Sequence, residues 1–302
     1  MRILSIQDAY SRKFERQKKI RKLQYHAAGH CVHVGKLSPG CKQCFIPCNS
    51  FNILTGSECN LRCPYCPTIK NVHGLSHKKE FRNLKFLLAH QSSLPNFNFQ
   101  KISFSGGGEP LMYMDVISEY MKLFHGLERH MKKRPWYFVY TNGTLADVDI
   151  LLQLKELGFD EIRFHLGATN FSKDVYNNLE SAVRYFKVIT VETPAWPLHR
   201  KKLFEMLPII EDIGVKHLNI GEIDIDKHNY DKISRILPNG EIYQYYTMYL
   251  YDNGLVYDII EEVVRKKYSY SVLDCNSFVK SIQRSSAKNI CHQDVKGLCA
   301  KY

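Results

Sequence analysis

The sequence predicts an α/β fold: a partial (β/α)6 barrel with an N-terminal cysteine-rich segment and an irregular C-terminal extension. The main observation is an alternation of strand-like and helix-like segments between residues 51 and 225. Parallel strands need a crossover connection, and a helix between successive strands supplies it. A second observation is that polar or glycine-rich turns follow several strands, where folds of this kind place their chemistry.

The expected strands are short apolar runs at 51–56, 101–105, 136–141, 161–166, 186–192 and 217–221. Helix-like stretches lie at 79–92, 113–131, 147–157, 173–185, 200–213 and 240–251, the last rich in tyrosine. The first 28 residues are expected to form an amphipathic helix. The predicted parts are a helix with a cysteine-rich segment at 1–50, the partial barrel at 51–225 and an extension at 226–302.

Composition narrows the class of protein. The chain has 302 residues, and its 44% hydrophobic and 24% charged content is ordinary for a soluble globular protein. A formal net charge of +12 favours an anionic partner, such as nucleic acid, an acidic peptide, a phosphorylated molecule or an acidic electron carrier. Basic residues crowd the first 25 positions, where a solvated helix face is the favoured interpretation.

Ten cysteines stand at ligand-like spacings rather than as an evident disulfide framework. The N-terminus lacks the apolar core of a secretory signal, and no apolar run approaches the roughly 18–20 residues that a membrane span needs. We therefore expect a cytoplasmic, oxygen-sensitive protein with no membrane partner, whose cysteines bind metal.

Three of these cysteines, Cys59, Cys63 and Cys66, stand in the loop that follows the first expected strand. A [4Fe–4S] cluster normally takes four thiolates, so three would leave one iron open. An open coordination position is typical of a metal centre that binds a substrate. The alternative is a three-cysteine zinc loop completed by a distant ligand.

Two further turns are expected at the same end of the barrel. A run of three glycines, Gly106 to Gly108, follows the second strand, and a backbone without Cβ atoms can approach a ligand closely. Asn142 lies in the polar turn after the third strand. The alternatives are a plain turn and the N-cap of the next helix.

In this order, the motifs Cys-x3-Cys-x-Tyr-Cys, Gly-Gly-Gly-Glu-Pro and Thr-Asn-Gly resemble those of the radical S-adenosylmethionine (SAM) superfamily over residues 51–225. The flanks resemble uncharacterised, mostly archaeal radical SAM proteins described as similar to pyruvate formate-lyase activating enzyme. The resemblance implies that the open iron chelates SAM, that the glycine motif binds the SAM amino group and that the Asn142 turn contacts its ribose. The cofactor-binding residues that we predict on this basis are Gly106, Gly107, Gly108, Glu109, Pro110, Asn142, Arg163 and His165.

The resemblance also implies a mechanism. A one-electron donor such as flavodoxin or ferredoxin reduces the cluster, which cleaves SAM into methionine and a 5′-deoxyadenosyl radical. The radical then abstracts a hydrogen atom from the substrate.

Polar residues alternate with apolar ones at the ends of the later strands. Arg163 and His165 should share one face of the fourth strand. If that face lines the barrel, they can hold the SAM carboxylate or a substrate anion, and otherwise they are surface groups. Three further residues are expected to face the same cavity, namely Glu192, Asn219 and Glu222.

A second group of cysteines offers an auxiliary metal site, either a [4Fe–4S] cluster or zinc. Its predicted ligands are Cys31, Cys41, Cys44 and Cys48, with Cys275 as a replacement for one of them. Cys291 and Cys299 could form a further site with His292, or be ordinary thiols.

The substrate is not fixed by these motifs. Basic charge and aromatic richness lean toward a peptide or protein side chain. The alternatives are a tRNA-modifying enzyme that uses the same chemistry and a non-catalytic protein that binds an iron–sulfur cluster or zinc.

Overall fold

The computed structural model describes residues 1–26, 30–46, 50–67, 100–105, 107–131, 133–245, 248–252 and 254–276. Within these ranges, no helix combines the length and apolar character that a bilayer crossing needs.

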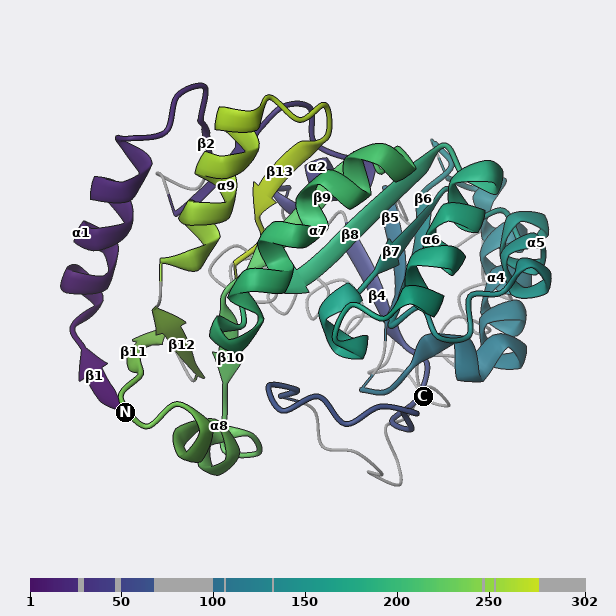
Figure 1. Cartoon of the computed structure of the whole chain (residues 1–302). Coiled ribbons are helices and arrows are strands. Elements are labelled where there is room, and N and C mark those ends of the chain that lie inside the picture. The colour runs from purple at the N-terminus through teal and green to yellow at the C-terminus, as the bar shows by residue number, and fades with distance from the viewer. Residues whose placement is uncertain are drawn as a thin grey trace.

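A nine-stranded sheet forms the body of the protein, in the order β2-β3-β13-β9-β8-β7-β6-β5-β4 (Figure 1). From β13 to β4 each strand runs parallel to its neighbours, and β3 and β2 continue the sheet antiparallel. The parallel strands are β4 (Ser50–Leu54), β5 (Lys101–Ser105), β6 (Trp136–Thr141), β7 (Glu161–Phe164), β8 (Val188–Pro194), β9 (His217–Gly221) and β13 (Ser271–Asp274). The antiparallel strands are β2 (Gln24–His26) and β3 (Cys31–Val34). Strands β2 and β4 stand at opposite ends of the sheet, so the described strands form a partial barrel.

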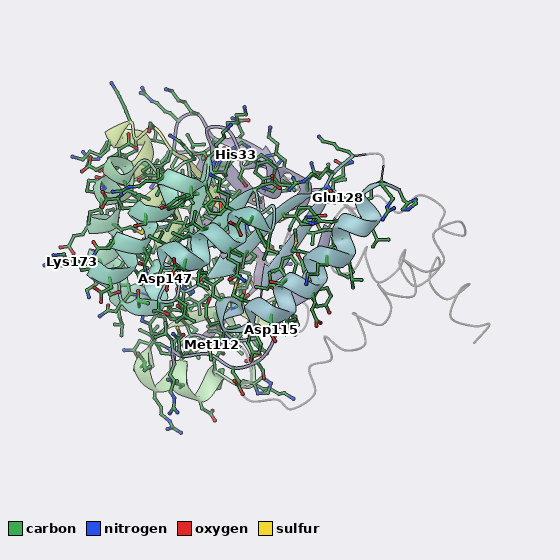
Figure 2. The ribbon with its side chains drawn as sticks, turned by 90° about the vertical axis from the view of Figure 1, so that its right-hand side faces the viewer. His33, Met112, Asp115, Glu128, Asp147 and Lys173 are labelled. Carbon is green, nitrogen blue, oxygen red and sulfur yellow. The ribbon has the colours of Figure 1, made fainter. Side chains whose placement is uncertain are left out.

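Helices between the strands pack on this sheet. They are α4 (Met114–Glu128), α5 (Val148–Glu156), α6 (Lys173–Tyr185), α7 (Arg200–Ile213) and α9 (Leu255–Lys266). Figure 2 shows part of this outer row, with Asp147 and Lys173 at the first turns of α5 and α6. The apolar faces of the helices and strands meet in one core, where Phe104, Phe124 and Tyr137 are fully buried. Strands covered on both faces read as nearly continuous apolar runs, which explains why they were visible in the sequence.

A second sheet of four strands stands beside the first, in the order β1-β11-β12-β10. Its strands are β1 (Arg2–Leu4), β10 (Ile223–Ile225), β11 (Glu241–Tyr245) and β12 (Met248–Asp252). Helix α1 (Ile6–Gln17) lies against this sheet and α9, fixed by ion pairs from Arg12 to Glu241 and from Arg16 to Asp258. The remaining helices are the short α2 (Pro39–Cys44) and α8 (Tyr230–Ile236), with one-turn 3-10 helices at η3 (Pro110–Tyr113), η4 (Leu166–Thr169) and η5 (Pro197–His199).

The α/β class and the six predicted core strands are confirmed, as are the helices predicted at 113–131, 147–157, 173–185 and 200–213. The helix predicted at 79–92 lies outside the described residues.

The structure corrects the sequence prediction at both ends of the chain. The tyrosine-rich segment 240–251 is not a helix: β11 and β12 pair antiparallel, with Ile242 opposite Tyr251. Tyrosine and isoleucine favour strands, and β1 on the other side of β11 gives them a sheet to join. The N-terminal helix covers only 6–17, because Ser5 caps it and accepts a hydrogen bond from the Asp8 amide.

The extension predicted as irregular is regular through much of its described length. Helix α9 leads into β13, which pairs with β9 and adds a seventh parallel strand to the sheet. Strand β3 pairs with the other side of β13. Segments from both flanks therefore complete the sheet that the central segment begins.

Candidate functional site

A cavity of about 750 Å³ is lined by the carboxyl ends of the parallel strands and also by Ser50 and Lys101, the first residues of β4 and β5. Seven cysteines lie in the described ranges; all of them are free thiols, and all line this cavity. Three belong to the loop 55–67, which we call the cysteine loop, namely Cys59, Cys63 and Cys66. The other four, which we call the second thiol set, are Cys31, Cys41, Cys44 and Cys275.

The glycine motif holds the cysteine loop in place. The Gly108 amide donates to the Gly56 carbonyl at 3.1 Å, and the Glu109 amide donates to the Glu58 carbonyl at 2.8 Å. A Cβ atom on Gly108 would lie 1.7 Å from the Glu58 carbonyl oxygen. Gly108 must therefore be glycine for the loop to lie here. Gly107 and Pro110 line the cavity too, whereas Gly106 lies outside the described residues.

The carboxylate of Glu109 is held by groups of the protein itself. It accepts hydrogen bonds from the Thr141 hydroxyl at 2.7 Å, the Asn142 amide at 2.7 Å and the Leu111 amide at 3.1 Å. Burial raises the pKa of Glu109, and these three donors oppose that rise. Glu109 thus ties the end of β6 to the glycine motif.

Asn142 connects the third turn to the cysteine loop. Its side-chain amide donates to the Asn60 side chain at 2.8 Å, and its oxygen accepts from the Thr144 hydroxyl at 2.7 Å. Its nitrogen also lies 4.0 Å from the Cys59 sulfur. The two turns and the loop therefore form one hydrogen-bonded unit.

The thiols of the cysteine loop are half-buried at the cavity wall. Cys59 Sγ accepts a hydrogen bond from the Leu61 amide at 3.4 Å. Tyr65 is buried, with its ring 5.9 Å from that of His165 and 5.4 Å from that of Trp196. Burial, and secondly the nearby Cys63 thiol, raise the pKa of the Tyr65 phenol.

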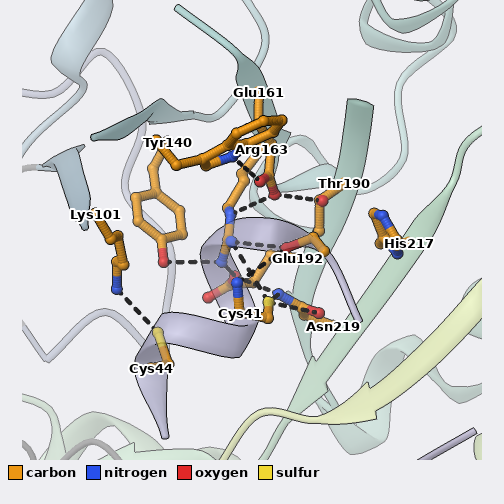
Figure 3. Close-up of polar contacts among 12 residues, drawn as sticks. Cys41, Cys44, Lys101, Tyr140, Glu161, Arg163, Thr190, Glu192, His217 and Asn219 are labelled. Atoms are coloured by element: carbon orange, nitrogen blue, oxygen red, sulfur yellow. Dashed lines mark hydrogen bonds and ion pairs between the residues drawn. The ribbon is translucent and has the colours of Figure 1, made fainter. Parts of the chain in front are cut away.

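Arg163 and His165 both line the cavity, and the surface alternative for Arg163 is wrong, since this side chain is 1% exposed. Its guanidinium lies 4.0 Å from the centroid of the Phe138 ring. It forms ion pairs with Glu161 at 2.8 Å and Glu192 at 3.2 Å, and donates to the Cys41 sulfur at 3.4 Å (Figure 3). Arg163 thus contacts the second thiol set.

Asn219 belongs to the same network, because its side-chain nitrogen donates to Glu192 at 3.0 Å and to Cys41 at 3.4 Å. The Cys41 thiol is fully buried. Its pKa is raised by burial, an effect that the neighbouring Arg163 opposes.

The second thiol set comes from three separate segments. The Cys31 thiol donates a hydrogen bond to the Asp274 carbonyl at 3.0 Å, and the side chain packs with Cys41, Leu37 and Leu273. The pKa of Cys31 lies well above its ordinary value, first through burial and then through nearby Asp274 and the other thiols of the set. Cys44 receives a hydrogen bond from Lys101 at 2.9 Å. Cys48 lies outside the described residues, as do Cys291, His292 and Cys299.

Glu222 and Asp274 form an acidic wall of the cavity. Lys13 of α1 reaches Glu222 at 2.7 Å, and the Tyr243 hydroxyl donates to the same carboxylate at 2.7 Å. Asp274 accepts from the Tyr257 hydroxyl at 3.0 Å, and burial followed by the charge of Glu222 raises its pKa to about 7.

Sequence reasoning missed both lysines at this site. Lys101 alternates with Ser103 and Ser105 along β5, and all three line the cavity, so a polar face in an otherwise apolar strand was the signal. Lys13 stands between Ala9 and Gln17 at helical spacing, and these are the buried positions of α1.

The donors present fit an iron–sulfur cluster. Three free thiols on one loop face a cavity of about 750 Å³, and thiolates are the ligands that such clusters take. Across the described ranges, no three His, Cys, Asp or Glu side chains converge on the position of a single metal ion.

Comparison with curated proteins gives one relative, the tungsten-containing aldehyde ferredoxin oxidoreductase cofactor-modifying protein of Pyrococcus furiosus. The two chains are 26% identical over 185 residues, which are 60% of this chain and 44% of the relative. The match therefore spans less than half the length of that protein.

Solved structures give partial likenesses. "Native anSMEcpe with bound AdoMet and Cp18Cys peptide" has a TM-score of 0.46 at 20% identity, covering 63% of this chain and 58% of that one. SuiB of Streptococcus suis bound to S-adenosylmethionine has a TM-score of 0.44 at 12% identity, covering 64% and 48%.

The family model of the Radical SAM superfamily matches residues 53–190. These residues run from β4 and the cysteine loop, through the glycine motif and the Asn142 turn, to β8. Residues 53–190 therefore form a domain that matches the radical SAM superfamily.

Proposed function

We propose that this protein is a radical SAM enzyme that holds a [4Fe–4S] cluster on Cys59, Cys63 and Cys66 and takes a hydrogen atom from a substrate bound in the cavity. The observation that carries the proposal is the joining of the cysteine loop, the glycine motif and the Asn142 turn into one hydrogen-bonded unit beside the cavity. The match to this family implies the cluster and SAM.

When bound, the reduced cluster would give one electron to SAM, and the resulting cleavage into methionine and a 5′-deoxyadenosyl radical would supply the group that takes hydrogen from the substrate. The residues of the chain bind and orient. Gly107 leaves its backbone open to a ligand, and His165 adds an imidazole to the cavity wall. The reductant is proposed to be a protein of the ferredoxin or flavodoxin class.

A peptide or protein side chain is the favoured substrate. The tRNA alternative relied on the basic N-terminal helix, but two of its arginines are already paired. Arg12 lies 2.5 Å from Glu241, and Arg16 lies 2.6 Å from Asp258. These ion pairs dock α1 onto the body, and they leave less of its charge for a phosphate backbone.

We further propose that the second thiol set holds an auxiliary iron–sulfur cluster. Its four thiols line the same cavity as the cysteine loop, so a centre there would stand within reach of the substrate. The set offers four thiols, which is the number of thiolates that a [4Fe–4S] cluster normally takes.

The test is anaerobic reconstitution with iron and sulfide, followed by iron counts, electron paramagnetic resonance (EPR) and assay of 5′-deoxyadenosine. The two variants are the triple replacement Cys59→Ala, Cys63→Ala, Cys66→Ala and the double replacement Cys41→Ala, Cys44→Ala. Each serves as the control of the other, since both remove thiols from the same cavity.

The triple variant should lose the signal that SAM perturbs and form no 5′-deoxyadenosine, while keeping a second cluster. The double variant should keep SAM cleavage and lose iron. A wild-type protein that carries its iron but cleaves no SAM would contradict the enzymatic proposal. A triple variant that retains only zinc would contradict the auxiliary cluster.

A further inference from the structure

Lys101, the first residue of β5, is a buried cation at the second thiol set. The residue is only 2% exposed. Its ammonium group donates to the Cys44 sulfur at 2.9 Å (Figure 3) and lies 5.2 Å from the centroid of the Phe138 ring. The acceptor that this buried ammonium group contacts is therefore a cysteine sulfur.

A buried charge is costly unless an opposite charge or strong hydrogen bonds compensate it. In the part of the chain that the structure describes, no carboxylate lies within ion-pair distance of Lys101. A neutral thiol is a weak acceptor and compensates little of this charge, whereas a thiolate compensates it fully.

Arg163 also contacts the second thiol set, but unlike Lys101 it is paired with carboxylates. Its single positive charge already faces the carboxylates of Glu161 at 2.8 Å and Glu192 at 3.2 Å. Its hydrogen bond to Cys41 therefore brings no surplus positive charge to the thiols. Lys101 is the cation whose charge is left to balance the sulfur atoms.

We propose that Lys101 is the counter-charge of an anionic thiolate centre on Cys41 and Cys44, completed by Cys31 and Cys275, and that its charge sets the reduction potential of that centre. This inference rests on the auxiliary cluster proposed above. Lys101 acts through Cys44, and so it is a positioning residue. An anionic group of a substrate is the other ligand that could balance the same ammonium.

The test is a redox titration of the full-length, reconstituted protein, followed by EPR. Addition of SAM separates the two clusters, because only the cluster of the cysteine loop should respond to SAM. The variants are Lys101→Met, which removes the charge and keeps the length, and Lys101→Arg, which keeps the charge. Lys187→Met is the matched control, since it removes one charge at an exposed position.

In Lys101→Met, reduction of the SAM-insensitive cluster should become about tenfold less favourable, a shift of ~59 mV to more negative potential for a one-electron couple. The sign follows because removing a nearby positive charge disfavours the more negative, reduced form. Lys101→Arg and Lys187→Met should keep the wild-type potential. Loss of this cluster's iron in Lys101→Met but not in Lys101→Arg would support the same conclusion.

The inference is overturned by a wild-type potential in Lys101→Met, which would favour the anionic substrate group as the partner of Lys101. An equal shift in Lys101→Arg would also overturn it, since shape rather than charge would then matter. If the wild-type protein cleaves SAM normally but has no SAM-insensitive cluster, the proposed auxiliary centre does not exist and the inference is overturned. Failure of the enzymatic proposal is a separate result, namely absence of 5′-deoxyadenosine in the wild type.

Discussion

Gly108 and Glu58 touch through their backbones, at the point where the glycine motif meets the cysteine loop. A Cβ atom at Gly108 would lie 1.7 Å from the Glu58 carbonyl oxygen, far inside any contact that atoms tolerate. The residue that follows Glu58 is Cys59, the first cysteine of the cysteine loop. A side chain at Gly108 must therefore move the thiols.

We predict that Gly108→Ala lowers iron incorporation at the cysteine loop and abolishes SAM cleavage. The added methyl group pushes Glu58 away and breaks the hydrogen bond from the Glu109 amide to the Glu58 carbonyl. Iron counts and 5′-deoxyadenosine formation measure the effect. Gly126→Ala, in helix α4, is the control and should behave as wild type, because alanine suits a helix interior better than glycine.

Replacement of Glu109 by Gln should weaken SAM binding without removing the cluster. The carboxylate accepts from Thr141, Asn142 and Leu111, and a Gln amide would turn a donor toward one of these donors. One buried donor left without a partner costs about 1–3 kcal/mol. Denaturant unfolding and titration with SAM test this, and an unchanged SAM affinity in a stable Glu109→Gln protein would show that the Asn142 turn does not matter for binding.

Lys13→Met should destabilise the protein by about 3–5 kcal/mol, as expected when one partner of a buried ion pair is removed. The side chains of Lys13 and Glu222 are 5% and 8% exposed, and their ion pair measures 2.7 Å. Adding Glu222→Gln to this variant should recover part of the loss, because the orphaned charge is then gone. The variant Arg12→Ala should cost far less, because water screens the ion pair of an exposed side chain. Urea unfolding of the three variants provides the comparison.

His217 predicts a dependence of stability on pH. His217 is the first residue of β9, its Nδ1 lies 2.6 Å from the hydroxyl of Ser271 in β13, and burial lowers its pKa from 6.5 to about 4. The unfolded chain then binds the proton more readily than the folded one. Stability should be intact above pH 6.5 and fall as the pH decreases toward 4, and His217→Asn should flatten this slope in unfolding measured across that range.

The sequence was most informative where a segment is buried on both faces or carries a motif. Strand β6 and helix α6 were predicted to the residue, because their own apolar patterns, rather than contacts with distant segments, decide their structure. The three motifs of the site were found through their resemblance to those of the radical SAM superfamily, in the order of the strands that they follow.

The predictions failed where distant contacts decide the structure. The run that holds Tyr243 and Tyr251 has no turn signal, and its division into two strands follows from the pairing of β11 with β1 and with β12. The meeting of Lys13 with Glu222 depends on how α1 docks, which no local pattern contains. Lys101 was visible only as a polar residue in a strand.

Cys31 donates a hydrogen bond to the Asp274 carbonyl across 243 positions of the chain. The cysteine loop is continuous in sequence, and its thiols are available once the first turns of the barrel exist. The second thiol set instead forms only after β13, the last described strand in chain order, has been synthesised and has paired between β3 and β9. Contacts of such high sequence separation form late in folding. The two proposed metal centres should therefore assemble in order, and a chain truncated before β13 should fill only the first.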